Sequence, residues 1–274
     1  MNNLLSLISL CFCLNVANLS YAESPPRISD RGDMISATQS QPELSARTII
    51  EKAYQAAGGH QFRHPKTLFL SGYNIIGHKD GSETLWDQYA MWREFAPDKP
   101  DAHVASGKVR IEAWTLDKNA LFLAFDGVNT YNQHGLMNGV DANTMWANNF
   151  GFSAIRYALD EGWQQERQPD DLVDGLLAYI VKLTDPSGGS TLFGFRQSDF
   201  AIVYVGFNTA KGWHERRYSH FFQKPGETWV QAGRVRLFYN GIKANEAIWT
   251  DYEVGVSFDA SLFEPSGPPS KPLW

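Results

Sequence analysis

The second half of the chain, residues 176–263, repeats a strand-and-turn pattern that constrains the fold more than any other feature of the sequence. Apolar residues alternate with small or polar ones, as strands require because successive side chains point to opposite faces. The expected strands are Leu177–Leu183, Phe193–Phe195, Phe200–Phe207, Trp213–Phe222, Thr228–Tyr239 and Ala247–Phe258. Gly, Pro and Asn supply the backbone angles of tight turns, and they occur between strands at 185–189, 224–226 and 240–241. The pattern predicts an antiparallel meander.

The first half predicts one helix and a second series of strands. Helical spacing within 42–57 gives an apolar stripe of Ile49, Ile50, Ala53, Tyr54 and Ala57. Gly58-Gly59 then supplies the left-handed residues that often end a helix. The strands expected next are Thr67–Ile76, Ser82–Arg93, Lys108–Leu116 and Ala120–Phe125, with turns at 80–81 and 126–127. Helical spacing returns between 139 and 168, where we expect one or two short helices, and Asp170-Asp171 is expected in a loop.

The N-terminal residues have the pattern of a targeting segment. Leu4–Leu14 is an apolar run too short to span a membrane, and Ser20-Tyr21-Ala22 places small residues at the spacing that a signal peptidase reads. We therefore expect a signal peptide at 1–22 and a periplasmic protein. A flexible leader (23–41), one domain (42–263) and a Pro-rich tail (264–274) are expected to follow.

Cysteine usage adds a restriction to this interpretation. Cys11 and Cys13 both lie within the expected signal peptide, so the mature chain would have no thiol for a disulfide or a metal site. Lipidation of Cys11 is a second interpretation, but Leu10 stands where a lipidation signal has a small residue.

Charge excludes several classes of partner. The chain has 24 Lys and Arg against 30 Asp and Glu, a net charge of −6, and no basic cluster suited to nucleic acid or to an anionic membrane surface. Its basic groups, Arg216-Arg217 and Arg234/Arg236, are expected to be solvated or ion-paired on a strand face. His214 and His220 share the strand face of Arg216 and Tyr218, which we expect to be the outer face of the sheet.

Motifs of covalent chemistry are missing from the sequence. No nucleophile elbow, phosphate-binding loop, dinucleotide fingerprint, zinc-protease motif or calcium loop occurs, so we expect no catalytic residue, cofactor or metal. His60 and His64 are four residues apart, but Gly58-Gly59 and Pro65 interrupt the helix that would align them, and no third ligand is evident.

Two alternatives to a binding protein stay open. An acidic group in the middle of the chain could serve a secreted hydrolase that acts on an envelope glycan or a small molecule, since glycosidases use paired carboxylates. This group is Glu161, Glu166, Asp170, Asp171 and Asp174, and solvation in a polar loop accounts for it as well. The other alternative is a module that binds a protein partner along a sheet edge.

Aromatic and aliphatic side chains on the expected strands are the candidate ligand-binding residues. Aromatic residues make up 14% of the chain, more than a core alone requires. Long antiparallel sheets that curve widely enclose cavities, whereas short closed barrels fill theirs with side chains. The candidates, each of which packs in the core or lines such a cavity, are Trp86, Trp92, Leu121, Leu123, Phe193, Phe195, Tyr218 and Trp249. A one-residue slip in register would exchange the two faces.

The order of elements resembles the outer-membrane lipoprotein-sorting (LolA/LolB-like) superfamily. The resemblance lies in the first helix ending in Ala56-Ala57-Gly58-Gly59, the strand series, the helical interruption, the long meander and the segment Trp213–Phe221. It implies a mainly β (α+β) fold, in which one curved antiparallel sheet forms an unclosed β-barrel covered by an N-terminal helix and short central helices. It also implies that the hollow holds acyl chains or other lipids, and it brings no catalytic residues.

The resulting expectation is a periplasmic carrier or binding protein for a lipid or acyl-chain-like hydrophobic ligand. It would take part in outer-membrane lipoprotein or envelope lipid trafficking, as a monomer that is not an enzyme, with a transient envelope protein as a further partner.

Overall fold

The computed structural model of the chain describes residues 44–97, 101–265 and 272. The expected signal peptide, the leader and most of the Pro-rich tail lie outside the described residues, so these assignments and the domain boundaries stay predictions. Among the described residues, no helix has both the length and the apolar character that crossing a bilayer requires.

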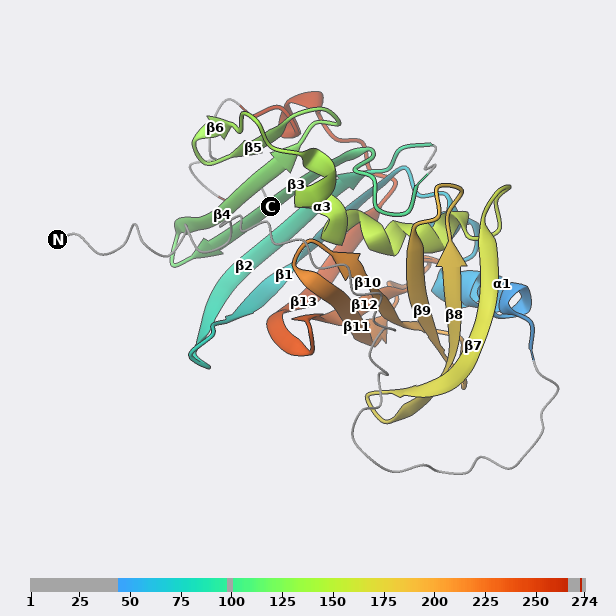
Figure 1. Ribbon diagram of the computed structural model, residues 1–274. Coiled ribbons are helices and arrows are strands. Elements are labelled where there is room, and N and C mark those ends of the chain that lie inside the picture. Colours follow the sequence, from blue (N-terminus) through green and yellow to red (C-terminus); the bar gives the residue numbers. More distant parts are fainter. Residues whose placement is uncertain (1–43, 98–100, 266–271, 273–274) are drawn as a thin grey trace.

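One antiparallel sheet dominates the structure (Figure 1). Its first series of strands is β1 (Thr67–Gly77), β2 (Glu83–Glu94), β3 (Lys108–Thr115), β4 (Lys118–Phe125), β5 (Thr130–Asn132) and β6 (Gly135–Leu136). The second series is β7 (Gln164–Val173), β8 (Leu176–Thr184), β9 (Ser190–Arg196), β10 (Ile202–Thr209), β11 (Gly212–Phe222), β12 (Gln231–Tyr239) and β13 (Ile242–Val254).

The sheet joins two meanders side by side. Strands follow the order β6-β5-β4-β3-β2-β1-β13-β12-β11-β10-β9-β8-β7, so within each series sequence neighbours are also neighbours in the sheet. The junction is the pairing of β1 with β13, where Leu68 lies opposite Val254. The expected turns at 80–81, 126–127, 185–189, 224–226 and 240–241 all join antiparallel neighbours, so the predicted meander is confirmed. The sheet curves without closing, which confirms the unclosed barrel.

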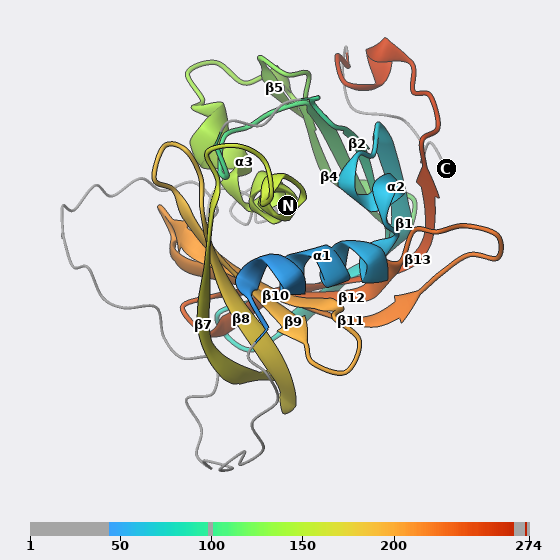
Figure 2. The ribbon, with the colours of Figure 1, turned by 90° about the vertical axis from the view of Figure 1, so that its right-hand side faces the viewer.

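Five helical segments accompany the sheet in the described part of the chain: α1 (Ala46–Ala57), α2 (His60–Arg63), α3 (Ala142–Gly151), and the 3₁₀ segments η2 (Phe152–Tyr157) and η3 (Ala260–Leu262). The sheet curves around α1 and α3 (Figure 2). The chain must run from β6 at one edge of the sheet to β7 at the other, and α3 and η2 make that connection.

Helix α1 ends where its sequence predicts, but it begins at Ala46 rather than at residue 42. The hydroxyl of Ser45 accepts a hydrogen bond from the Thr48 amide at 3.1 Å, which caps the N-terminus. Gly58 has φ +124°, a conformation that favours glycine, and it ends the helix. Ile49, Ile50, Ala53 and Tyr54 are buried, as the apolar stripe predicts. They form one core with strand residues such as Phe193 and Phe195 on the concave face of the sheet.

The prediction of a loop at Asp170-Asp171 is wrong, because both residues lie in strand β7. The pairing register of β7 with β8 shifts between Gln168 and Asp171. This shift is a bulge, and it contains Pro169. Strand β7 is an edge strand, and an edge strand tolerates proline and polar residues because one side of its backbone needs no partner. Its polar sequence therefore resembles that of a loop.

Candidate functional site

A cavity of about 500 Å³ lies on the concave side of the sheet. Its walls come from α1, α2, α3 and η2 and from strands in both series, β1 to β3 and β9 to β13, so it bridges the junction between the two meanders. The volume falls within the range of small-molecule sites, about 300–1,000 Å³.

Most of the lining is apolar. Aliphatic side chains of the sheet, including Leu68, Leu70 and Val235, form one wall, and Phe62 and Trp229 contribute aromatic rings. Phe62 and Trp229 also contact each other, with ring centroids 5.7 Å apart. Such a lining favours a ligand with apolar surface, because transfer of that surface out of water is the main source of binding free energy.

A stacked pair of aromatic rings forms part of the wall at the junction. Tyr89 on β2 and Trp249 on β13 both lie opposite Gly72 of β1, which separates the two strands. Because Gly72 has no side chain, the two rings meet across β1, with centroids 5.0 Å apart and an interplanar angle of 22°. Burial raises the pKa of Tyr89 to about 12, so this wall is uncharged at neutral pH.

Residues of β11 face the cavity at alternate positions as far as Tyr218. Arg216 and Tyr218 face it, as alternation requires. His220 then has φ +54°, while the pairing with β12 keeps its register from Ser219–Arg234 to Phe221–Ala232. Beyond His220, Phe221 lines the cavity as well, although strict alternation would place it on the other face.

Four arginines also line the cavity: Arg93, Arg156, Arg196 and Arg216. Arg93 donates a hydrogen bond from Nη1 to the carbonyl oxygen of Asn149 at 2.6 Å. Arg156 donates from Nε to the carbonyl oxygen of Phe62 at 2.8 Å. Burial, followed by repulsion from Arg156 and Arg216, lowers the pKa of Arg93 to about 9, and burial lowers the pKa of Arg156 to about 10. Both remain mainly protonated at neutral pH.

His214 fixes the position of Arg216. The Nε–H group of Arg216 donates to Nε2 of His214 at 3.2 Å. His214 is fully buried between the rings of Phe207 and Tyr239. Burial, followed by the charge of Arg216, lowers the pKa of His214 to about 2, so the imidazole is neutral and accepts this hydrogen bond.

The expectation that Arg216, His214 and Tyr218 lie on the outer face is therefore wrong: their side of β11 is the concave one. Arg217, the next residue, does lie on the outer face and is ion-paired there, as expected for the basic groups. Alternation places neighbouring residues on opposite faces but does not show which face is concave.

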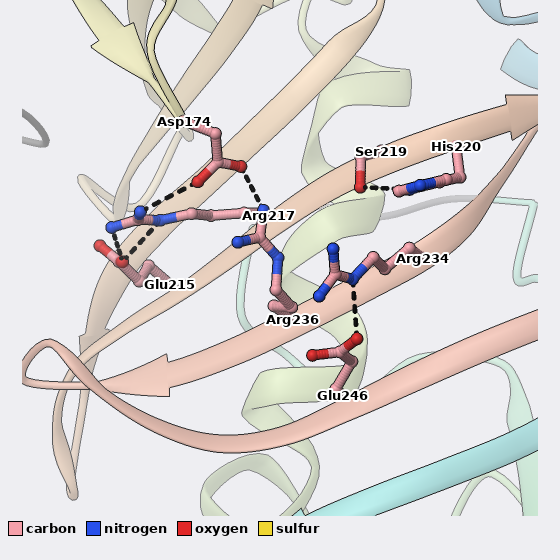
Figure 3. A network of polar contacts seen from close by, with 8 residues as sticks. All are labelled: Asp174, Glu215, Arg217, Ser219, His220, Arg234, Arg236 and Glu246. Carbon is pink, nitrogen blue, oxygen red and sulfur yellow. Dashed lines mark hydrogen bonds and ion pairs between the residues drawn. The ribbon is translucent and has the colours of Figure 1, made fainter.

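The outer face of β11, β12 and β13 carries a network of ion pairs (Figure 3). Arg217 contacts Glu215 at 2.7 Å and Asp174 at 3.2 Å, Arg236 also contacts Asp174, and Arg234 contacts Glu246 at 2.7 Å. Asp174 reaches this face from the turn between β7 and β8.

The carboxylates considered for a hydrolase are not among the described lining residues of the cavity. Glu166 pairs with Lys182 at 3.9 Å, and Asp170 accepts a hydrogen bond from Gln197 at 2.6 Å. Asp174 belongs to the outer network. In the described part of the chain, no three or more His, Cys, Asp or Glu side chains are grouped so as to hold a metal ion.

The structure places the eight candidate ligand-binding residues in different surroundings. Tyr218 and Trp249 line the cavity. Phe193 and Phe195 are fully buried in the core beside it, Leu121 and Leu123 are half-buried near Trp146 of α3, and Trp86 is half-buried near Tyr89. Trp92 lies on the outer face in a cluster with Ala90 and Phe263, because its neighbours Met91 and Arg93 are the residues that face inward.

Sequence reasoning missed most of the lining. On β2 the lining residues are Tyr89, Met91 and Arg93, which lie on the face opposite to that of Trp92. The alternation separates the two faces of the strand but does not show which one lines the cavity. Arg156 and Phe62 come from short helical segments, where no strand period exists to indicate them.

These features define a curved, unclosed antiparallel sheet with an apolar cavity on its concave face. Among solved structures, the chain is similar to an outer-membrane lipoprotein-sorting protein domain from Vibrio parahaemolyticus, at 10% identity and a TM-score of 0.50, over 80% of this chain and 97% of the other. The LolA superfamily protein NE2245 from Nitrosomonas europaea gives 14% identity and a TM-score of 0.49, over 81% and 98%. A DUF1329 family protein from Desulfovibrio piger has 13% sequence identity and a TM-score of 0.47, and the match covers 81% of this chain and 98% of the other.

The chain thus shares the fold of this lipoprotein-sorting domain, which confirms the resemblance at the level of the fold. No family model and no curated protein matches the sequence.

Proposed function

We propose that this protein is an exported binding or carrier protein that holds a lipid-like ligand in the cavity and performs no covalent chemistry. The observation that carries the proposal is the cavity itself, about 500 Å³ in volume and lined mainly by apolar and aromatic side chains. The fold, shared with a domain named for lipoprotein sorting, supports a role in envelope lipid or lipoprotein trafficking.

Burial of apolar surface would supply most of the affinity. Each methylene group transferred from water contributes ~0.8 kcal/mol, so a long alkyl chain gains more than a short one. The loss of translational and rotational freedom on association costs about 4–15 kcal/mol, which burial of a short alkyl chain cannot offset. Affinity should therefore rise steadily with chain length until the cavity is full.

A titration of delipidated protein with dodecanol tests this proposal, because dodecanol has a long chain and no charge. We expect saturable binding that weakens as the alcohol is shortened. A Val235→Asp variant should bind much more weakly, since it places a carboxylate in the apolar wall.

The matched control for that variant is Ile242→Asp. It makes a similar change at a side chain that is 74% exposed, and it should bind like the parent protein. Folded, delipidated parent protein that bound no alcohol of any length would exclude the carrier function.

A further inference from the structure

The charges that face the cavity are unbalanced. Arg93, Arg156, Arg196 and Arg216 line it, whereas Asp199 is the one carboxylate among the described lining residues. Asp199 is already engaged by Arg196, in a bidentate pair with distances of 2.8 and 2.5 Å. The lining thus carries an excess of positive charge in a chain whose net charge is −6.

Arg156 and Arg216 have no carboxylate within 4.0 Å among the residues that the structure describes. This contrasts with the outer face of the same sheet, where Arg217, Arg234 and Arg236 are all ion-paired. A buried charge is costly unless another charge or a set of hydrogen bonds compensates it. The fold therefore leaves these two cavity-facing guanidinium groups without the anion that their outer counterparts have.

Neighbouring groups orient the arginines and compensate them in part. The guanidinium of Arg156 lies over the rings of Phe62 and Phe95, 4.6 and 4.9 Å from their centroids. Cation–π contacts stabilise a buried cation but do not neutralise it. Arg216 is held from one side by neutral His214, an acceptor without charge. These contacts fix the positions of the cations before any ligand enters, which lowers the entropic cost of binding.

We propose that the cavity recognises an amphiphile with an anionic head group, a carboxylate or a phosphate, which lies against Arg156 and Arg216 while the alkyl chain occupies the apolar part. Guanidinium groups suit both anions because their planar donors match the oxygen geometry. Arg93 adds a third positive charge, close enough that Arg156 and Arg216 both lower its pKa. The inference deepens the proposed function and rests on it, because it names the chemical class of the ligand.

Three ligands with one chain and different heads test the inference on the delipidated protein: dodecanol, dodecanoate and dodecyl phosphate. By calorimetric titration at neutral pH, at least one anionic ligand should bind about tenfold to a hundredfold more tightly than dodecanol, as expected for hydrogen bonds to a charged partner. The tighter of the two anions identifies the head group.

Two single substitutions on one strand locate the effect. Arg216→Gln removes the cavity-facing charge, and it should abolish most of the preference for the anion over dodecanol. Arg217→Gln is the matched control, since it removes the same charge from the outer face of β11 and should keep the preference. The melting temperature of each variant shows whether it is folded.

The outcomes separate the two proposals. Parent protein that binds dodecanol and both anions equally would overturn the anionic head group and leave the carrier function intact, whereas binding of none of them would overturn both. An equal loss of preference in the two variants would assign the effect to overall charge and refute the site. If Arg216→Gln does not fold, the comparison of ligands on the parent protein still decides the inference.

Discussion

Gly72 holds the two meanders of the sheet together, and a single methyl group there should weaken the fold severely. A Cβ atom at residue 72 would lie 1.8 Å from the carbonyl oxygen of Ile248 on β13, far inside van der Waals contact. That oxygen is backbone, so strand β13 itself would have to move. The same residue separates Tyr89 from Trp249, and their stacked rings would part as well.

The magnitude follows from these contacts. Overpacking of this kind costs ~1–3 kcal/mol, displacement of one or two ladder hydrogen bonds adds about 1 kcal/mol each, and loss of the aromatic pair adds ~0.5–1.5 kcal/mol. We therefore expect Gly72→Ala to lower the free energy of unfolding by roughly 2.5–6.5 kcal/mol. Typical domains have only about 5–15 kcal/mol in total.

Urea denaturation, monitored by tryptophan fluorescence, measures this difference in the free energy of unfolding. Another glycine on β1 offers a matched control. At Gly77 an added Cβ atom would lie 3.2 Å from the nearest atom, the carbonyl oxygen of Lys243, so a small shift accommodates it. Gly77→Ala should stay within about 1 kcal/mol of the parent, as substitutions that cause little strain do. If Gly72→Ala were as stable as Gly77→Ala, the close approach of β1 and β13 would not hold the fold.

Three other predictions concern acid stability, the core and export. The pKa of His214 is about 2 in the fold against 6.5 as its ordinary value, so protonation favours the unfolded chain and stability falls as the pH drops below 6.5. Between pH 7 and pH 5 urea denaturation should show that the free energy of unfolding falls by ~2 kcal/mol. An equally large fall in the His214→Gln variant would mean that other titrating groups cause it. Phe193→Ala should cost ~3–5 kcal/mol by urea denaturation, because the ring is fully buried. A similar loss of stability with Trp86→Ala, at a half-buried position, would contradict that account. For export, N-terminal sequencing of the protein from an envelope fraction should show a chain that begins at Glu23. A chain that begins at Met1 would refute the signal peptide.

The sequence by itself determines the local structure of this protein. Strand periodicity and turn residues such as Asn240-Gly241 identify the strands of the two meanders except β5, β6 and β7. The apolar stripe and Gly58-Gly59 identify helix α1 and its C-terminal end. These features are predictable because they depend on neighbouring residues: turn dihedrals, capping hydrogen bonds and the alternation of side chains all act over a few positions.

Only the tertiary structure decides which face of each strand encloses the cavity. Trp92 and Arg93 are adjacent, and the alternation along β2 is equally compatible with either side chain on the concave face. The pairing of Leu68 with Val254 selects one arrangement, across a separation in sequence that no local pattern spans. Beyond His220, which has φ +54°, Phe221 departs from the alternation along β11 and lines the cavity. The same choice directs Arg216 toward the cavity and Arg217 toward its carboxylate partners, because two neighbouring side chains on a strand cannot share a face.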